Sequence, residues 1–165
     1  MDLKAFRRHR LNLAAEQAGV DLLVATLPAN IEYVSGYTSV GQYVVHSTQS
    51  YALYIPSENR FLFAVSLAEI PGVVERVGED AQIFPYGSFR FCHQGDAFVN
   101  KLVQEKALSS YASGEEALIA AIRSTGKTKI ALDESRMTRT SWEKVASSCK
   151  DCSFIPGQPV FLQAR

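Results

Sequence analysis

Several groups of residues in this 165-residue sequence have types and spacings that could do chemistry, and the first is Gly126-Lys127-Thr128. The triplet matches the end of a nucleotide-binding phosphate loop. The full pattern also requires a glycine five positions before Gly126, where this chain has Ala121. A phosphate loop leaves a strand and begins a helix, whereas this triplet leaves an expected helix and enters a strand. We therefore interpret it as a helix-to-strand turn.

Two of the three cysteines, Cys149 and Cys152, form a lone Cys-x-x-Cys pair. A zinc site needs four ligands, and no second pair or histidine cluster accompanies this one. A thiol–disulfide site would place the pair at a helix N-terminus, where the helix dipole lowers the thiol pKa. Here the pair falls at the expected end of a helix, where the dipole has the opposite effect. We expect Cys149 to be a buried apolar residue and Cys152 a loop residue.

The remaining candidates are acids and histidines. Asp133-Glu134 follows an expected strand, where α/β enzymes often place catalytic acids, but helix capping or solvation is the simpler interpretation. Asp96 is close in sequence to Cys92 and His93, yet nothing beyond proximity supports a nucleophile set. The histidines lack the spacing of metal ligands: His9, His46 and His93. Taken alone, the sequence shows no self-sufficient catalytic or metal-binding set.

Composition and charge argue against several classes of protein. Lys plus Arg and Asp plus Glu number 17 each, so nucleic acid and anionic membrane are not expected partners. The basic run Arg7-Arg8-His9-Arg10 lies on an expected helix and is interpreted as a solvated face. No apolar run approaches the roughly 20 residues that span a bilayer, and the N-terminus lacks a signal-peptide core. An odd number of cysteines without framework spacing favours a reducing, cytoplasmic location.

Hydrophobic periodicity and capping patterns predict one α/β domain over residues 1–165, with a mixed sheet and helices on both faces. Two expected helices cover residues 3–18 and 28–35, and a third runs from Asp96 to Ala107. Three more are expected to begin at the capping boxes of Ser66 and Ser113 and at Thr140. We expect Pro71 and Gly72 to interrupt the helix that follows Ser66. Expected strands cover residues 22–25, 44–45, 51–55, 61–65, 81–84, 129–132 and 154–155. The strands in the middle of the chain form an antiparallel meander, with a hairpin turn at residues 57–60.

Residues 21–37 form the most specific pattern. A buried strand is followed by a tight turn, Pro28 presets the first helical φ, and Gly36 can leave the helix through a positive φ. The sequence motif Asn30-Ile-Glu-Tyr33-Val-Ser-Gly36-Tyr37 resembles the amino-terminal domain shared by creatinase, prolidase and aminopeptidase P. The resemblance covers nearly the whole chain, through Lys129–Glu134 to Phe161–Arg165, which is similar to the start of the family's linker helix.

The resemblance implies a ribonuclease-H-like domain, which in the family precedes a catalytic domain. In the family's peptidases, the carboxy-terminal domain holds two divalent metal ions (Mn, Co or Zn) with aspartates, a histidine and glutamates. None of these ligands has a counterpart here, so no catalytic or metal residue is assigned. The chain is expected to be the noncatalytic, inactive-alone part of an Xaa-Pro dipeptidase or aminopeptidase P-like hydrolase. The expected partners are its own catalytic domain, a second copy in a homodimer, and the peptide substrate of the parent enzyme.

In the family this domain makes dimer contacts and borders the entrance to the active site. By position, the loop Gly36–Tyr43 is the candidate here, with Tyr37, Gln42 and Tyr43 as its contact residues. Core or rim packing of the two tyrosines is the alternative interpretation. Two other functions remain open from the residues: a freestanding ligand- or protein-binding module, and a small α/β enzyme using Asp133, Glu134 and His93.

Overall fold

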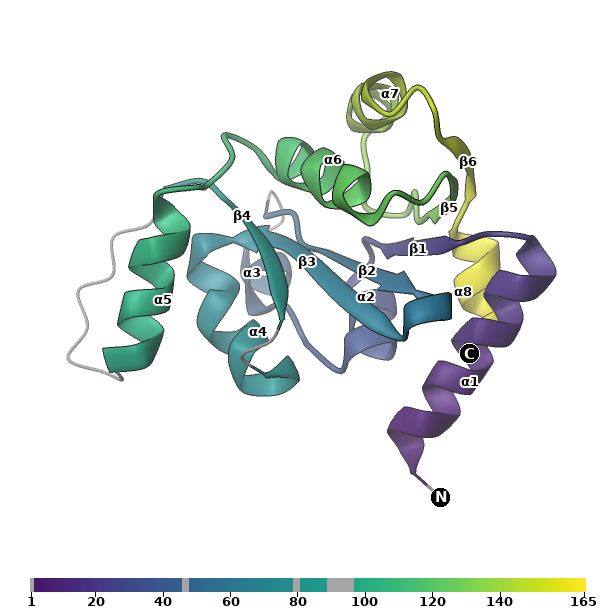
Figure 1. The fold of residues 1–165 in the computed structure, drawn as a ribbon, viewed down its shortest axis with the longest axis horizontal. Helices are drawn as coiled ribbons and strands as arrows, with labels where there is room; N and C mark the ends of the chain where they lie inside the picture. Colours follow the sequence, from purple (N-terminus) through teal and green to yellow (C-terminus); the bar gives the residue numbers. More distant parts are fainter. Residues whose placement is uncertain (1, 46–47, 79–80, 89–96) are drawn as a thin grey trace.

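A computed structural model describes residues 2–45, 48–78, 81–88 and 97–165 of the chain. Strands in the described residues form one mixed sheet in the order β4-β3-β2-β1-β5-β6 (Figure 1). They are β1 (Leu22–Ala25), β2 (Tyr51–Ile55), β3 (Arg60–Ser66), β4 (Gln82–Tyr86), β5 (Lys129–Leu132) and β6 (Ser153–Pro156). The β1–β2 and β2–β3 pairs are antiparallel, and the other neighbouring pairs are parallel. The predicted mixed sheet and its central antiparallel meander are therefore confirmed.

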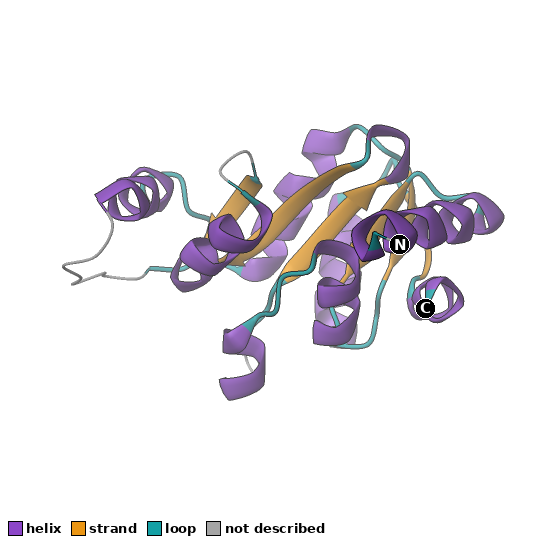
Figure 2. Cartoon of the chain, turned by 90° about the horizontal axis from the view of Figure 1, so that it is seen from below, coloured by secondary structure: helices purple, strands orange, loops and turns teal. Residues whose placement is uncertain are grey.

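Helices pack on both faces of this sheet, as the sequence predicted (Figure 2). They are α1 (Leu3–Ala18), α2 (Pro28–Ser35), α3 (Val40–Val44), α4 (Ile70–Val77), α5 (Ala97–Ala107), α6 (Gly114–Thr125), α7 (Arg139–Ser148) and α8 (Gln158–Ala164), with 3-10 turns η1 (Pro56–Glu58) and η2 (Leu67–Glu69). Helices α6 and α7 cover one face, whereas α1, α2, α4 and α8 cover the other (Figure 1). Each face buries its own apolar core.

Strand β1 shows why the sheet needs helices on both sides. All four of its residues are fully buried. Leu23 and Ala25 belong to the core under α1 and α2, while Leu22 and Val24 belong to the core under α6. Successive strand side chains point to opposite faces, so a continuous apolar run is stable only where both faces are covered.

Three local predictions were wrong. Residues 44–45 were expected to be a strand, but Val44 ends the short helix α3, because the Ser39 hydroxyl accepts a hydrogen bond from Gln42 N (3.2 Å) and starts a helical turn. Helix α7 is capped by Thr138 rather than Thr140, through a 3.1 Å bond from Ser141 N. The Ser66 capping box begins the 3-10 turn η2 and not an α-helix. Helix α4 begins after it with Pro71 in its first turn, where the missing N–H is not needed, so the expected interruption near Pro71 is found.

Candidate functional site

The segment between α2 and β2 carries the three residues expected at a cleft entrance. Gly36 ends α2 in the left-handed region, with φ 76°, and the chain turns toward α3. Beyond this turn the three side chains have different environments. Tyr37 and Gln42 are only 5% and 3% exposed, whereas Tyr43 is 58% exposed. Of the three, Tyr43 alone lies on the outer surface of the domain.

Tyr37 packs into the core beneath the segment. Its ring meets Phe63 of β3 edge to face, with ring centroids 6.2 Å apart and an interplanar angle of 89°. Burial, and then the neighbouring Glu69 carboxylate, raise the pKa of the Tyr37 hydroxyl above its ordinary value. Tyr37 is therefore a neutral packing residue at physiological pH, as the alternative interpretation of the sequence proposed.

A buried carboxylate holds α3 to the rest of the chain. Glu69, which is 7% exposed, accepts hydrogen bonds from the hydroxyls of Ser39 and Ser50 and from Gly41 N (3.0 Å). The approach is so close at Gly41 that a Cβ there would lie 2.8 Å from Glu69 Oε1. Glu69 of η2 thus binds Ser39 before α3, Gly41 in its first turn and Ser50 after it.

Gln42 fixes the same helix to the sheet. Its Nε2 donates to the carbonyl oxygens of Thr26 and Ser50, both at 3.2 Å. These carbonyls lie just after β1 and just before β2, so the buried face of α3 is anchored on two central strands. Its other face is apolar and open: Val40, Tyr43, Val44 and the following Val45 are 68%, 58%, 73% and 49% exposed.

Asp133 caps the beginning of α2. The residue is fully buried after β5, and its Oδ2 accepts from Thr26 N, Leu27 N and Asn30 Nδ2 at 2.8–3.1 Å. Its Oδ1 accepts from Ser135 N at 3.0 Å. Burial opposes ionisation, but these hydrogen bonds outweigh it and lower the pKa of Asp133 below its ordinary value. Leu27, the residue at the start of α2, supplies no side-chain cap of its own, so Asp133 replaces one.

Glu134 does the same for a different helix. Its Oε2 accepts from Gly157 N (3.1 Å) and Gln158 N (3.3 Å), the first amides of α8. The chain passes so close to the end of β5 at this point that a Cβ on Gly157 would lie 2.5 Å from Asp133 N. The capping interpretation of the two acids is therefore confirmed, with one acid on each of two helices.

The motif residues Asn30 and Tyr33 also contact α8. Asn30 Nδ2 donates to Gln158 Oε1 (2.9 Å) at the beginning of the helix, and the Tyr33 hydroxyl donates to Ala164 O (2.6 Å) at its end. Arg10 of α1 adds bonds from Nε and Nη2 to the Ala164 and Gln163 carbonyls, at 3.2 and 2.9 Å. The most specific stretch of the sequence is thus the part that positions α8. Sequence reasoning missed this role, because the partners are more than 100 residues apart.

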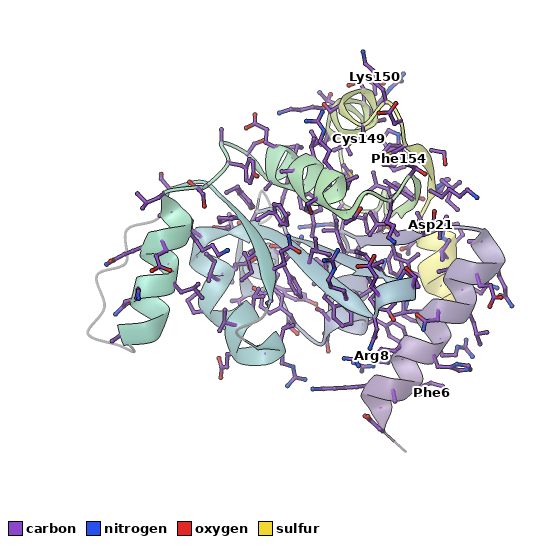
Figure 3. The ribbon with its side chains drawn as sticks, viewed as in Figure 1. Phe6, Arg8, Asp21, Cys149, Lys150 and Phe154 are labelled. Atoms are coloured by element: carbon purple, nitrogen blue, oxygen red, sulfur yellow. The ribbon has the colours of Figure 1, made fainter. Side chains whose placement is uncertain are left out.

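The other chemical candidates have structural roles. Gly126 follows α6 with φ 66°, so the Gly-Lys-Thr triplet is the predicted helix-to-strand turn. Cys149 is buried at the end of α7, far from Arg8 of α1 (Figure 3), and Cys152 is partly buried in the turn that follows. Burial raises the pKa of both thiols, which opposes nucleophilic reactivity.

Some candidates lie outside the described residues: His46, Cys92, His93 and Asp96. Within the described ranges, no three His, Cys, Asp or Glu side chains are grouped so that they could share a metal ion. No helix there has both the length and the apolarity to cross a membrane. The described site can therefore cap helices, anchor α3 and present an apolar face.

The arrangement is that of a mixed α/β domain whose conspicuous acids stabilise helix ends. The family model described as "Creatinase/Prolidase N-terminal domain" matches residues 7–165, and the chain belongs to this family. No curated protein matches the chain at a significant level.

Solved structures show the same fold. The N-terminal domain of the cytoplasmic peptidase PepQ from Mycobacterium tuberculosis aligns with TM-score 0.66 and 12% identity, over 96% of this chain and 98% of that one. The Xaa-Pro aminopeptidase chain from Streptococcus thermophilus gives 0.63 and 12%, over 98% of each chain. The Xaa-Pro dipeptidase from Bacillus anthracis gives 0.61 and 16%, over 93% of this chain. The present chain corresponds to 33% of that dipeptidase.

Proposed function

We propose that the chain is the noncatalytic amino-terminal domain of an Xaa-Pro peptidase-type metalloenzyme, and that the exposed face of α3 contacts a second copy of the chain beside the entrance to the catalytic cleft. The observation that carries the contact is the α3 face itself. Val40, Tyr43 and Val44 stand at positions i, i+3 and i+4, which places them on one side of the helix. Together with Val45 they form the α3 patch.

The α3 patch has the character of an interface. Singly exposed apolar residues are normal, but a contiguous group marks a surface that another molecule covers. Glu69 and Gln42 hold the buried side of α3 in place, so the patch is presented in one geometry and loses little freedom on binding. A tyrosine at its centre adds a large ring with a polar tip, which suits a contact that is only partly dry.

The catalytic part of the proposal rests on family membership. The Bacillus anthracis relative of three times this length is an Xaa-Pro dipeptidase, and the Mycobacterium tuberculosis relative is described as a cytoplasmic peptidase. We assign hydrolysis, the peptide substrate and the two divalent metal ions (Mn, Co or Zn) to a carboxy-terminal catalytic domain of the parent. Helix α8, fixed at both ends, sets the direction in which the chain approaches that domain. A cytoplasmic location of the parent fits the description of the Mycobacterium tuberculosis relative.

The test is self-association of the chain with and without a charge on the α3 patch. Burying a valine side chain contributes about 1.5–3 kcal/mol, and a homodimer loses it in both copies, so Val44→Asp should weaken dimerisation by roughly two to four powers of ten. Sedimentation equilibrium measures the dissociation constant, and circular dichroism checks that the variant is folded. Leu108→Asp is the matched control, because Leu108 is 92% exposed and lies outside the patch.

The expected result is a dimer for the original chain and for Leu108→Asp, and a monomer for Val44→Asp. A chain that stays monomeric at high concentration, or a dimer that is indifferent to Val44→Asp, would rule out α3 as the contact between copies.

A further inference from the structure

A polar cavity of about 280 Å³ lies beside the ends of β1 and β5 and is distinct from the exposed α3 patch. Its lining includes Gln42, Gln49, Tyr51 and Arg136. In open α/β sheets, ligands bind outside the carboxyl ends of the strands, which is where Thr26 and Arg136 follow β1 and β5. The volume is far above the roughly 10–15 Å³ that one water needs, and just below the range of about 300–1,000 Å³ for drug-sized ligands. The cavity therefore suits a small polar molecule.

Two buried polar atoms belonging to lining residues lack a partner. Gln42 Oε1 and the Tyr51 hydroxyl have no hydrogen-bond partner within the described part of the chain, although their side chains are only 3% and 2% exposed. The orientation of the Gln42 amide is set by its Nε2, which donates to Thr26 O and Ser50 O. Gln42 Oε1 is thus a hydrogen-bond acceptor without a donor in the described part of the chain. Buried polar groups are nearly always paired with protein, ordered water or a ligand, so these two atoms are available to a molecule in the cavity.

The surroundings of the cavity carry both signs of charge. The guanidinium of Arg136 lies beside α3, where Nη2 donates to Gln42 O at 3.4 Å. On the side of Tyr51, Glu115 accepts from Gln49 Nε2 (3.1 Å) and from the Ser141 hydroxyl (2.8 Å). Burial raises the pKa of Tyr51, and the negative charge of Glu115 raises it further. A ligand with a negative and a positive end would match this arrangement.

We propose that this cavity binds a free, small α-amino acid, with its carboxylate toward Arg136 and its ammonium group toward Gln42 Oε1 and the Tyr51 hydroxyl. The ammonium N–H groups supply the donor that Gln42 Oε1 lacks, and the Tyr51 hydroxyl accepts a second. No residue of the α3 patch lines the cavity, so this binding is separate from the proposed contact between copies.

The experiment is a titration of the isotopically labelled chain, followed by amide chemical shifts. The probes are glycine, L-alanine and L-serine, with acetate and methylammonium as ligands that carry only one of the two charges. We expect saturable shifts at the amides of Gln42, Tyr51 and Arg136 with at least one amino acid. Acetate and methylammonium should bind at least tenfold more weakly, because each leaves one end of the cavity unmatched.

Variants then locate the binding. Tyr51→Phe removes only the unpartnered hydroxyl, so the fold should persist while affinity falls at least tenfold. Arg136→Met tests the carboxylate end and decides the matter if Tyr51→Phe does not fold. Tyr54→Phe is the matched control, since the Tyr54 hydroxyl bonds Asn12 (2.8 Å) in the core on the other face of the sheet.

Three results would overturn the proposal. One is the absence of a saturable shift with all three amino acids. Another is equal affinity in the original chain, Tyr51→Phe and Arg136→Met. The third is a crystal structure grown with the amino acid at saturation in which only ordered water pairs Gln42 Oε1 and the Tyr51 hydroxyl.

Discussion

The substitution Asp133→Asn tests whether an ionised, buried carboxylate holds α2 in place. Asp133 Oδ2 has three donors and Oδ1 has one, and both α2 and the turn after β5 depend on them. In the variant, the amide oxygen takes the position with three donors, so the amide nitrogen must face Ser135 N. One hydrogen bond then becomes a contact between two donors, and the other three lose their charged acceptor.

The magnitude follows from these bonds. A hydrogen bond to a charged group contributes about 1.5–3 kcal/mol, against roughly 0.5–1.5 kcal/mol for a neutral one. Losing one bond outright costs about 1.5–3 kcal/mol and weakening three costs about 1 kcal/mol each, so the expected destabilisation at neutral pH is about 4–6 kcal/mol. Urea unfolding followed by far-ultraviolet circular dichroism measures the free energy of unfolding. Glu134→Gln is the control, because the exposed Glu134 caps α8 through one oxygen that an amide oxygen can replace. Its cost should stay below about 1 kcal/mol.

The same carboxylate predicts a pH dependence. The pKa of Asp133 is lower in the folded chain than in the unfolded chain, where an aspartate titrates near 3.9. Its contribution to stability is therefore complete above the unfolded-state pKa, and is lost as the pH falls through the folded-state pKa. The difference between the original chain and Asp133→Asn should shrink over that acid range. A difference below about 1 kcal/mol at pH 7, or one that does not change with acid, would refute a charged cap at this position.

Two further predictions concern close packing and thiol reactivity. Gly157→Ala should cost about 2–3 kcal/mol in urea unfolding, because the new Cβ would meet backbone atoms at 2.5–2.6 Å. Gly72→Ala should change stability by less than about 1 kcal/mol, because its Cβ would lie 3.3 Å from the edge of the Tyr37 ring. Equal effects of the two substitutions would contradict the close approach of Gly157 to β5. In a Cys92→Ser background, Cys149 of the folded chain should react with a disulfide reagent at pH 8 at least tenfold more slowly than Cys152. Both thiols should react more slowly in the folded chain than in the urea-unfolded chain, because burial raises the pKa of each thiol. Rapid labelling of folded Cys149 would show that the end of α7 is open.

Most of the fold could be predicted from the sequence because local signals and the final packing agree. The apolar run of β1, Pro28 at the start of α2 and Ser113 before α6 each act over a few residues, and the structure has them as predicted. Helix α3 was missed because Val44 and Val45 read as a strand, while the groups that favour the helix, Glu69 and Ser50, are brought there only by the fold.

The candidate site was less predictable for the same reason. Tyr37, Gln42 and Tyr43 share a short segment with polar and aromatic character, yet only the packing against Phe63 and the bonds from Gln42 Nε2 show which of them turn inward. The two acids after β5 were expected to cap helices or face solvent. That they cap α2 and α8, which begin far away in the sequence, follows from the sheet order and from no local pattern.

The attachment of α3 has a consequence for the stability of this helix. A five-residue helix is far too short to persist in water by itself, because the conformational entropy lost in forming its first turn exceeds the gain from its first hydrogen bond. The carboxylate that fixes this turn comes from Glu69, which reaches it only when β3 is in the sheet and η2 is formed. The stability of helix α3 therefore depends on contacts from the sheet and from η2, and not on the helix itself.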